Sequence, residues 1–313
     1  MAQKKIVICG GSGFLGEILT EYFSQKGYFV SIISRSKPKF KCDKYIQWDG
    51  RTLDGWELEL EDAEAVINMA GRSVDCRYSD TNKKLILNSR VYSTKVIGRG
   101  INRCVNPPKV WLNSSTATIY KHSFDKPMDE SGEIGATDEA KDAFSIEVAR
   151  AWEKELKNAS TPKTRKVALR TAMVLSSSPG GVFHVLRRLT RLGLGGKMGQ
   201  GDQFVSWIHE QDFCRAIEKI IDDSALSGIV NVAAPNPINN HGMMEIFRQV
   251  SEVSFGLPAS RWMLEVGAFF LRTETELIIK SRRVVPGRLL KSSFEFNYPE
   301  MLKAVQEIES RIE

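Results

Sequence analysis

The segment from Lys5 to Gly16 constrains the fold more than any other part of this sequence. It reads as an apolar strand, a glycine-rich turn and the start of a helix that continues to Gly27. A glycine at position 10 or 11 permits a tight turn, Gly13 lets backbone N–H groups approach a pyrophosphate, and Gly16 lets the helix lie close to the strand. The helix N-terminus would then face the phosphate charge. This order of elements predicts a dinucleotide-binding unit rather than an ordinary glycine-rich loop.

The second predicted strand, residues 28–33, ends about 20 residues beyond the glycines, where NAD-binding folds place an acidic residue on the ribose hydroxyls. This sequence has Ser34 and Arg35 there. A hydroxyl and a guanidinium donate charge-assisted hydrogen bonds that suit a 2′-phosphate. The pattern therefore predicts NADP(H) as the cofactor. The alternative is a solvated basic loop, because three lysines follow within six residues.

Composition places the chain among enzyme-sized globular proteins. Its 313 residues are enough for one large domain or two ordinary ones. The net charge of +6 and the pI near 9.0 are mildly basic, but the basic residues are dispersed, which argues against nucleic acid as a partner. A small-molecule substrate is the expected partner, and the sequence leaves a monomer or an oligomer open.

The cysteines indicate a reducing compartment. They are odd in number and contain no Cys-x-x-Cys pair, so we expect free thiols and a cytoplasmic protein. They are Cys9, Cys42, Cys76, Cys104 and Cys214. The N-terminus enters the first strand without room for a cleavable leader. The most apolar late stretch, Trp262 to Leu271, is too short to cross a bilayer, so no membrane span is expected.

Alternating strands and helices predict an α/β fold, a Rossmann-like doubly wound parallel sheet. Further strands are expected at residues 45–48, 65–69, 110–113, 167–174, 204–208 and 229–232, and helices at about 79–104, 140–157 and 210–221. Beyond Pro235 the pattern is helical, with elements at 243–253, 259–271 and 299–311. We therefore predict a cofactor-binding domain over residues 1–234 and a small, mainly helical C-terminal cap over 235–313 that roofs the pocket.

Several motifs resemble the extended short-chain dehydrogenase/reductase superfamily. They are the glycine loop 10–16, Asn-Met-Ala-Gly at 68–71 and Ser-Ser-Thr-Ala-Thr-Ile-Tyr at 114–120. Asn-Ser-Arg at 88–90, Ala-Trp-Glu at 151–153, Trp-Ile-His at 207–209 and the ending 285–289 are more specific. Together they resemble an atypical group called epimerase family protein, or NAD-dependent epimerase/dehydratase-like, with a C-terminal domain of unknown function. Some members of that group carry the label of cell-division inhibitor.

The resemblance implies which residues contact the cofactor. They are Gly10, Ser12, Gly13, Phe14, Leu15, Gly16, Ser34, Arg35, Met69, Ala70, Gly71, Arg90, Ser114 and Val174.

The chain departs from that superfamily where the chemistry is expected. There a Tyr-x-x-x-Lys helix supplies the proton donor, and the ammonium lowers the pKa of the tyrosine. Here Phe144 or Ser145 stands at the tyrosine position, and Val148 or Ala149 at the lysine position. The resemblance also places a catalytic hydroxyl at Thr116. A hydroxyl is therefore retained without its acid–base partners.

Other residues are candidates to replace the missing tyrosine. Tyr120 follows Thr116 at the end of the fifth strand, where open α/β sheets form their ligand crevice, although it could also be a packed aromatic. Trp207, His209 and Arg288 are candidate substrate contacts. The alternative for His209 is a packed side chain, with Asp212 only capping the helix that follows. The histidines show no metal-ligand spacing, so no metal is expected.

Five glycines between Leu192 and Gly201 do not form a strand–loop–helix unit, so we predict a mobile flap beside the substrate pocket. The function predicted from all these features is an NADP(H)-dependent oxidoreductase or a nucleotide-sugar epimerase-like enzyme of unknown substrate. The alternative is a non-catalytic NADP(H)-sensing or protein-interaction module, which the missing Tyr–Lys pair would explain.

Overall fold

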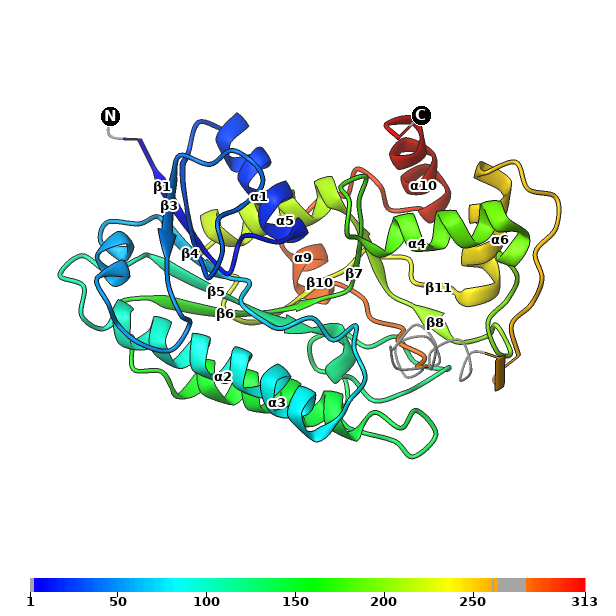
Figure 1. The fold of residues 1–313 in the computed structure, drawn as a ribbon, viewed down its shortest axis with the longest axis horizontal. Helices are drawn as coiled ribbons and strands as arrows, with labels where there is room; N and C mark the ends of the chain where they lie inside the picture. Colours follow the sequence, from blue (N-terminus) through cyan, green and yellow to red (C-terminus); the bar gives the residue numbers. More distant parts are fainter. Residues whose placement is uncertain (1–2, 261, 264–279, 313) are drawn as a thin grey trace.

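The computed structural model describes residues 3–260, 262–263 and 280–312. A parallel seven-stranded sheet forms its centre, in the order β10-β6-β5-β4-β1-β2-β3 (Figure 1). The strands are β1 (Lys5–Cys9), β2 (Phe29–Ser34), β3 (Lys44–Gln47), β4 (Ala65–Asn68), β5 (Val110–Thr116), β6 (Arg165–Thr171) and β10 (Gly228–Val232). The strand order reverses between β1 and β4, and the carboxyl ends on either side of this point form the ligand crevice in such sheets. The predicted Rossmann-like sheet is confirmed.

Helices cover both faces of this sheet. One face carries α1 (Phe14–Gln25) and α5 (Glu210–Asp222), and the other carries α2 (Asp80–Ile101) and α3 (Ala143–Asn158) (Figure 1). Side chains alternate along β1, so Ile6 and Ile8 pack with α1 and α5, whereas Val7 and Cys9 pack with the α2 side. Because both faces are covered, the central strands β1 and β4 are almost wholly apolar.

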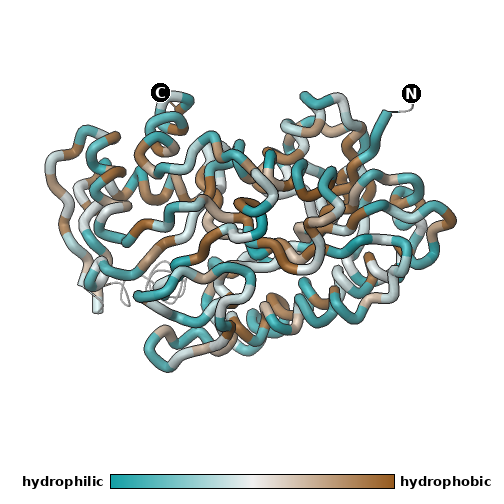
Figure 2. Tube along the Cα trace, turned by 180° about the vertical axis from the view of Figure 1, so that it is seen from behind, coloured by the Kyte–Doolittle hydropathy of each residue, from teal (hydrophilic) through white to brown (hydrophobic). Residues whose placement is uncertain are grey.

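A second lobe has its own apolar core. It contains α4 (Val182–Leu189), α6 (Asn240–Val250) and α10 (Met301–Ser310), with the short strands β7 (Met173–Leu175), β8 (Phe204–Val205), β9 (Trp207–His209) and β11 (Ile238–Asn239). Figure 2 shows hydrophobic segments inside both lobes. Segments before and after Pro235 therefore share one core, and the predicted division at residue 234 stays a prediction.

The end of the chain returns to the large sheet. Helix α9 (Gly287–Lys291) packs against β10, and Leu289 and Phe294 join the core under α5. The side chain of Lys280 is buried against Asp142, the N-cap residue directly before α3. A helical C-terminal segment is thus present, but its described residues are divided between the two lobes.

The element predictions differ from the structure mainly near the second lobe. The strand predicted at 167–174 is interrupted at Ala172, because β6 pairs within the large sheet and β7 pairs with β9. The strand predicted at 204–208 is likewise divided into β8 and β9, and α4 was not predicted. Most of the helix predicted at 259–271, including the apolar stretch from Leu264, lies outside the described residues. In the described parts of the chain, no helix is both long enough and apolar enough to cross a membrane.

Short helical turns complete the connections. They are η1 (Trp56–Leu60), η2 (Ala117–Ile119) and η3 (Thr190–Leu194).

Candidate functional site

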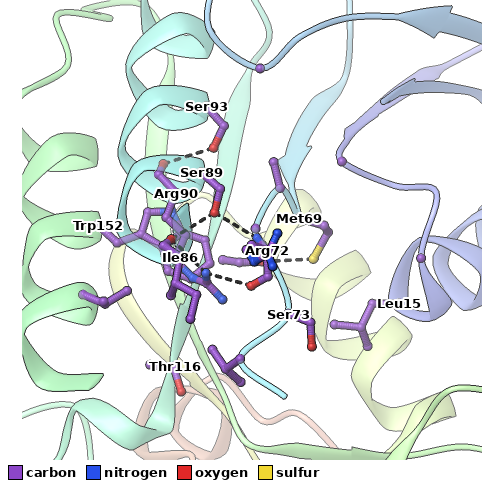
Figure 3. A pocket seen from close by; sticks show the side chains of 18 of the residues that line it. Leu15, Met69, Arg72, Ser73, Ile86, Ser89, Arg90, Ser93, Thr116 and Trp152 are labelled. Atoms are coloured by element: carbon purple, nitrogen blue, oxygen red, sulfur yellow. Dashed lines mark hydrogen bonds between the residues drawn. The ribbon is translucent and has the colours of Figure 1, made fainter. Parts of the chain in front are cut away.

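A cavity of about 960 Å³ opens at the carboxyl ends of the central strands. Every residue predicted to contact the cofactor lies on its wall, from the glycine loop through Ser34, Arg35 and Arg90 to Val174. Figure 3 shows Arg90, Trp152 and Thr116 on one side of the cavity and Leu15 and Met69 on the other. The structure therefore brings together residues that the sequence separates by more than 160 positions.

The glycine loop has the geometry that a dinucleotide requires. Gly10 has a φ of +74°, and a Cβ there would lie 2.4 Å from the Cα of Ala70. A Cβ on Gly16 would lie 2.0 Å from the carbonyl oxygen of Gly11, whereas Gly13 has open space beside it. Gly13 caps α1 without a side-chain hydrogen bond, so the first N–H groups of the helix are left for a ligand. This wall fits a pyrophosphate.

The wall of the cavity is strongly cationic. Arg35, Arg51, Arg72 and Arg90 line it, and among the lining residues Asp49 is the one carboxylate. Asp49 accepts hydrogen bonds from the backbone N–H groups of Arg51 and Thr52 and from the Thr52 hydroxyl. Desolvation opposes these hydrogen bonds, which together nevertheless lower the pKa of Asp49. A polyanionic ligand would complement such a wall.

The end of β2 lies at the rim of the cavity. The Ser34 hydroxyl donates to the backbone oxygen of Ser36 at 2.8 Å, and the Arg35 side chain is exposed. Across the rim the Arg51 guanidinium lies over the Tyr92 ring, 5.4 Å from its centroid. Trp48, Asp49 and Arg51 were missed in the sequence, although their place directly after the third strand could have indicated them.

Helix α3 presents to the cavity the positions that the resemblance assigns to the Tyr–Lys pair. Phe144, Ser145, Val148 and Ala149 all line the wall, so both alignments of the motif face the ligand space. The Phe144 ring packs edge-on against Tyr78, with centroids 5.0 Å apart. These positions carry no lysine and no tyrosine.

Thr116 is the hydroxyl at the end of β5 that remains available to a ligand. Its oxygen accepts the backbone N–H of Thr118 at 3.1 Å, and its own proton has no acceptor among the described residues. The neighbouring hydroxyls are engaged, because Ser115 donates to Glu153 at 2.6 Å and Ser114 to the Met69 sulfur at 2.9 Å. Thr116 can therefore donate into the cavity.

Tyr120 does not line the cavity, so its predicted catalytic role is not supported. Its side chain is fully buried, its hydroxyl donates to Asn231 Oδ1 at 2.7 Å, and the Arg170 guanidinium lies 4.9 Å from the ring centroid. Burial raises the pKa of the hydroxyl, although Arg170 and Asn231 act in the opposite direction. A tyrosine held in this way is a packing residue.

The predicted substrate contacts also lie away from the cavity wall. Trp207 is buried and its indole N–H donates to the Asn236 oxygen at 3.0 Å. His209 caps α5 through Nδ1, which accepts from the Gln211 N–H at 3.1 Å. Arg288 donates to the backbone oxygen of Ser227. These three side chains form their hydrogen bonds with the second lobe and with the edge of the sheet. Such distant partners could not be predicted from the sequence.

The other histidine nitrogen is also engaged. Nε2 of His209 lies 2.8 Å from Glu307 and therefore donates to it. Burial lowers the pKa of His209, and Glu307 opposes this effect.

The glycine-rich segment 192–201 is not a flap beside this cavity. It packs against residues 255–259, and a Cβ on Gly196 would lie 2.4 Å from the backbone of Leu257. Backbone hydrogen bonds join Leu257 to Gly193 and Ala259 to Lys197. The glycines permit two backbones to approach closely. None of the described residues beyond Pro235 lines the cavity, and the predicted roof stays a prediction.

The described residues contain no group of three histidine, cysteine, aspartate or glutamate side chains that could hold a metal ion. All five cysteines are free thiols.

Residues 6–233 match the NAD dependent epimerase/dehydratase family, which is most of the chain. The chain belongs to this family. Residues 259–308 match a domain of unknown function, DUF1731. Epimerase family protein YfhF of Bacillus subtilis (strain 168) is 29% identical over 305 residues, covering 97% of this chain and 97% of that protein. Human epimerase family protein SDR39U1 is 28% identical over 313 residues, covering 97% of this chain and 99% of that protein.

Solved structures agree with this membership of the epimerase/dehydratase family. The human protein SDR39U1 (isoform 2), crystallised with NADPH, superposes with a TM-score of 0.86 at 26% identity and covers 98% of this chain and 99% of its own. A nucleoside-diphosphate sugar epimerase from Corynebacterium glutamicum has a TM-score of 0.76 at 27% identity, covering 99% of this chain and 62% of that longer one. The epimerase/dehydratase fold therefore extends over nearly the whole chain.

Proposed function

We propose that this protein binds NADP(H) in the cavity and is an oxidoreductase or epimerase-like enzyme that works without a Tyr–Lys pair. The observation that carries the proposal is that one cationic cavity collects the glycine loop, the Ser34–Arg35 pair and the Thr116 hydroxyl. The related human protein was crystallised with NADPH, which supports the choice of cofactor.

Different residues of this chain would bind the cofactor and the substrate. Gly10, Gly13 and Gly16 let the start of α1 approach the pyrophosphate, and Arg35 would hold the 2′-phosphate, joined by Ser34 once its hydroxyl turns from the Ser36 oxygen. When bound, the nicotinamide supplies or accepts a hydride. The Thr116 hydroxyl would donate a hydrogen bond to the substrate oxygen.

Cofactor titrations test the proposal directly. NADPH and NADH are titrated against the wild type, Arg35→Ala and Arg35→Asp, with NADPH fluorescence or calorimetry as the measurement. One charge-assisted hydrogen bond contributes roughly 1.5–3 kcal/mol, so Arg35→Ala should weaken NADPH about ten- to a hundredfold and leave NADH nearly unchanged. Arg35→Asp should weaken NADPH further and favour NADH, because a carboxylate repels phosphate and accepts from ribose hydroxyls.

The matched control is Lys37→Ala, an exposed cation on the same loop that does not line the cavity. It should leave both affinities unchanged. Equal affinity of the wild type for the two cofactors would refute the NADP(H) assignment.

The substrate we propose is a small molecule with a carbonyl or hydroxyl group, and a sugar nucleotide is one such class. An NADP(H)-sensing module is the second candidate, which the apolar Phe144 and Val148 on the cavity wall favour. Stereospecific exchange of label from [4-³H]NADPH with a carbonyl library distinguishes the two, because a sensor exchanges none. The free thiols suit a reducing compartment, and we propose the cytoplasm.

A further inference from the structure

The cavity contains a cation on the side where the epimerase/dehydratase superfamily has its lysine, but the cation comes from a different helix. Arg90 belongs to α2, and its guanidinium lies 5.0 Å from the ring centroid of Trp152 on α3. Trp152 is one helical turn beyond Val148, and both line the cavity. The positive charge missing from α3 is thus restored by its neighbour (Figure 3).

The guanidinium is held in a fixed place. Its Nη1 donates to the backbone oxygens of Arg72 at 3.0 Å and Ile86 at 3.1 Å. A Cβ on Gly71 would lie only 3.1 Å from the Arg90 Cζ, so this glycine makes room for the group. Two carbonyls, an aromatic ring and a glycine therefore orient Arg90 in advance of ligand binding.

Arg90 also keeps donors for a ligand. Within the described part of the chain it forms no ion pair, and its Nη2 and Nε make no hydrogen bond to the protein. Burial lowers the pKa of Arg90 to about 10, with Tyr78 opposing, so the group stays charged at neutral pH. A partly desolvated cation without a carboxylate partner attracts a negatively charged oxygen strongly.

Building on the proposed function, we propose that Arg90 and Thr116 together form the site that stabilises the substrate oxygen during hydride transfer. As the hydride adds to a carbonyl carbon with its electron pair, the π pair of the C=O bond moves to oxygen. The alkoxide then accepts hydrogen bonds from Arg90 and Thr116 and takes a proton from water, which yields the alcohol and a hydroxide ion that leaves to the solvent and is neutralised there. Arg90 acts as a hydrogen-bond donor and keeps its own proton.

Binding of benzoate tests the site without turnover. Benzoate presents a planar carboxylate in place of the alkoxide, and it is titrated by calorimetry into the wild type, Arg90→Gln and Arg99→Gln, each saturated with NADPH. Arg90→Gln should weaken benzoate at least about tenfold, because a charged donor is lost. Arg99→Gln is the matched control, an exposed arginine on the same helix, and should bind as the wild type does. Equal binding by Arg90→Gln, or no binding by the wild type, overturns the proposal.

Turnover provides the second test, with 4-nitrobenzaldehyde and NADPH as the probe. Under the proposal Arg90, predicted from the sequence as a cofactor contact, binds the substrate oxygen instead, so Arg90→Gln should lower kcat by about 10²–10³-fold, while the affinity for NADPH changes little. Added guanidine should restore part of the rate to Arg90→Ala, which a purely structural role would not allow. If Arg90→Gln weakens NADPH with kcat unchanged, Arg90 is a cofactor contact and this inference fails, whereas the proposed function stands. Failure of the wild type to bind NADPH would instead refute the proposed function.

Discussion

The buried ion pair between Lys280 and Asp142 should contribute strongly to stability. The Lys280 side chain is 1% exposed and that of Asp142 is 0%. Lys280 also donates to the Thr118 oxygen at 2.6 Å, and Asp142 accepts the Thr137 N–H at 2.9 Å. The pair joins the C-terminal segment to the start of α3, which carries Phe144 and Ser145 to the cavity.

Lys280→Met should lower the free energy of unfolding by about 3–5 kcal/mol, because the Asp142 carboxylate is left buried without a counter-charge. Asp142→Asn should also lower the free energy of unfolding, because the buried Lys280 ammonium loses the Asp142 charge. The double variant removes both charges and keeps the acceptor for Thr137, so most of the loss should be recovered. The measurement is urea unfolding followed by tryptophan fluorescence.

The control is Lys121→Met, which breaks an exposed ion pair with Glu133. Such pairs contribute only about 0–1 kcal/mol. A loss as small as this for Lys280→Met, or a double variant whose loss equals the sum of the two single losses, would refute the reasoning.

Two further predictions concern residues that the structure places away from the cavity. Tyr120→Phe should leave NADPH affinity and turnover unchanged and cost roughly 1 kcal/mol of stability in urea unfolding, because it loses one buried hydrogen bond to Asn231; a loss of turnover would show that the hydroxyl reaches substrate. The folded-state pKa of His209 lies below its unfolded value of about 6.5, so its stabilising contribution is complete above pH 6.5 and is lost as the pH falls, when the unfolded chain takes up the proton first. His209→Asn should therefore flatten stability against pH below 6.5, and an unchanged slope would contradict this.

The sequence by itself determined the cofactor half of this protein. The strand, glycine turn and helix of residues 5–25 depend on local periodicity and on glycine conformations that neighbouring residues specify. Parallel strands bring their carboxyl ends to one edge, so the order of the elements along the chain is enough to place the ends of β2, β4 and β5 beside the glycine loop. The residues predicted there all line one cavity for this reason.

Tertiary structure alone decided which residues lie opposite the cofactor half. Tyr120 follows Thr116 by four positions, yet its hydroxyl is directed to Asn231, 111 residues further along the chain. Local sequence predicts the position of a side chain on a strand, but the residues that this side chain contacts come from distant segments. Arg90 reaches the lysine side of the cavity only because α2 and α3 pack together and bring Trp152 beneath its guanidinium. A cation that one helix supplies to a site on its neighbour leaves no motif in the sequence. The number of residues between Arg90 and Trp152 is set by how α2 and α3 pack and not by the period of either helix.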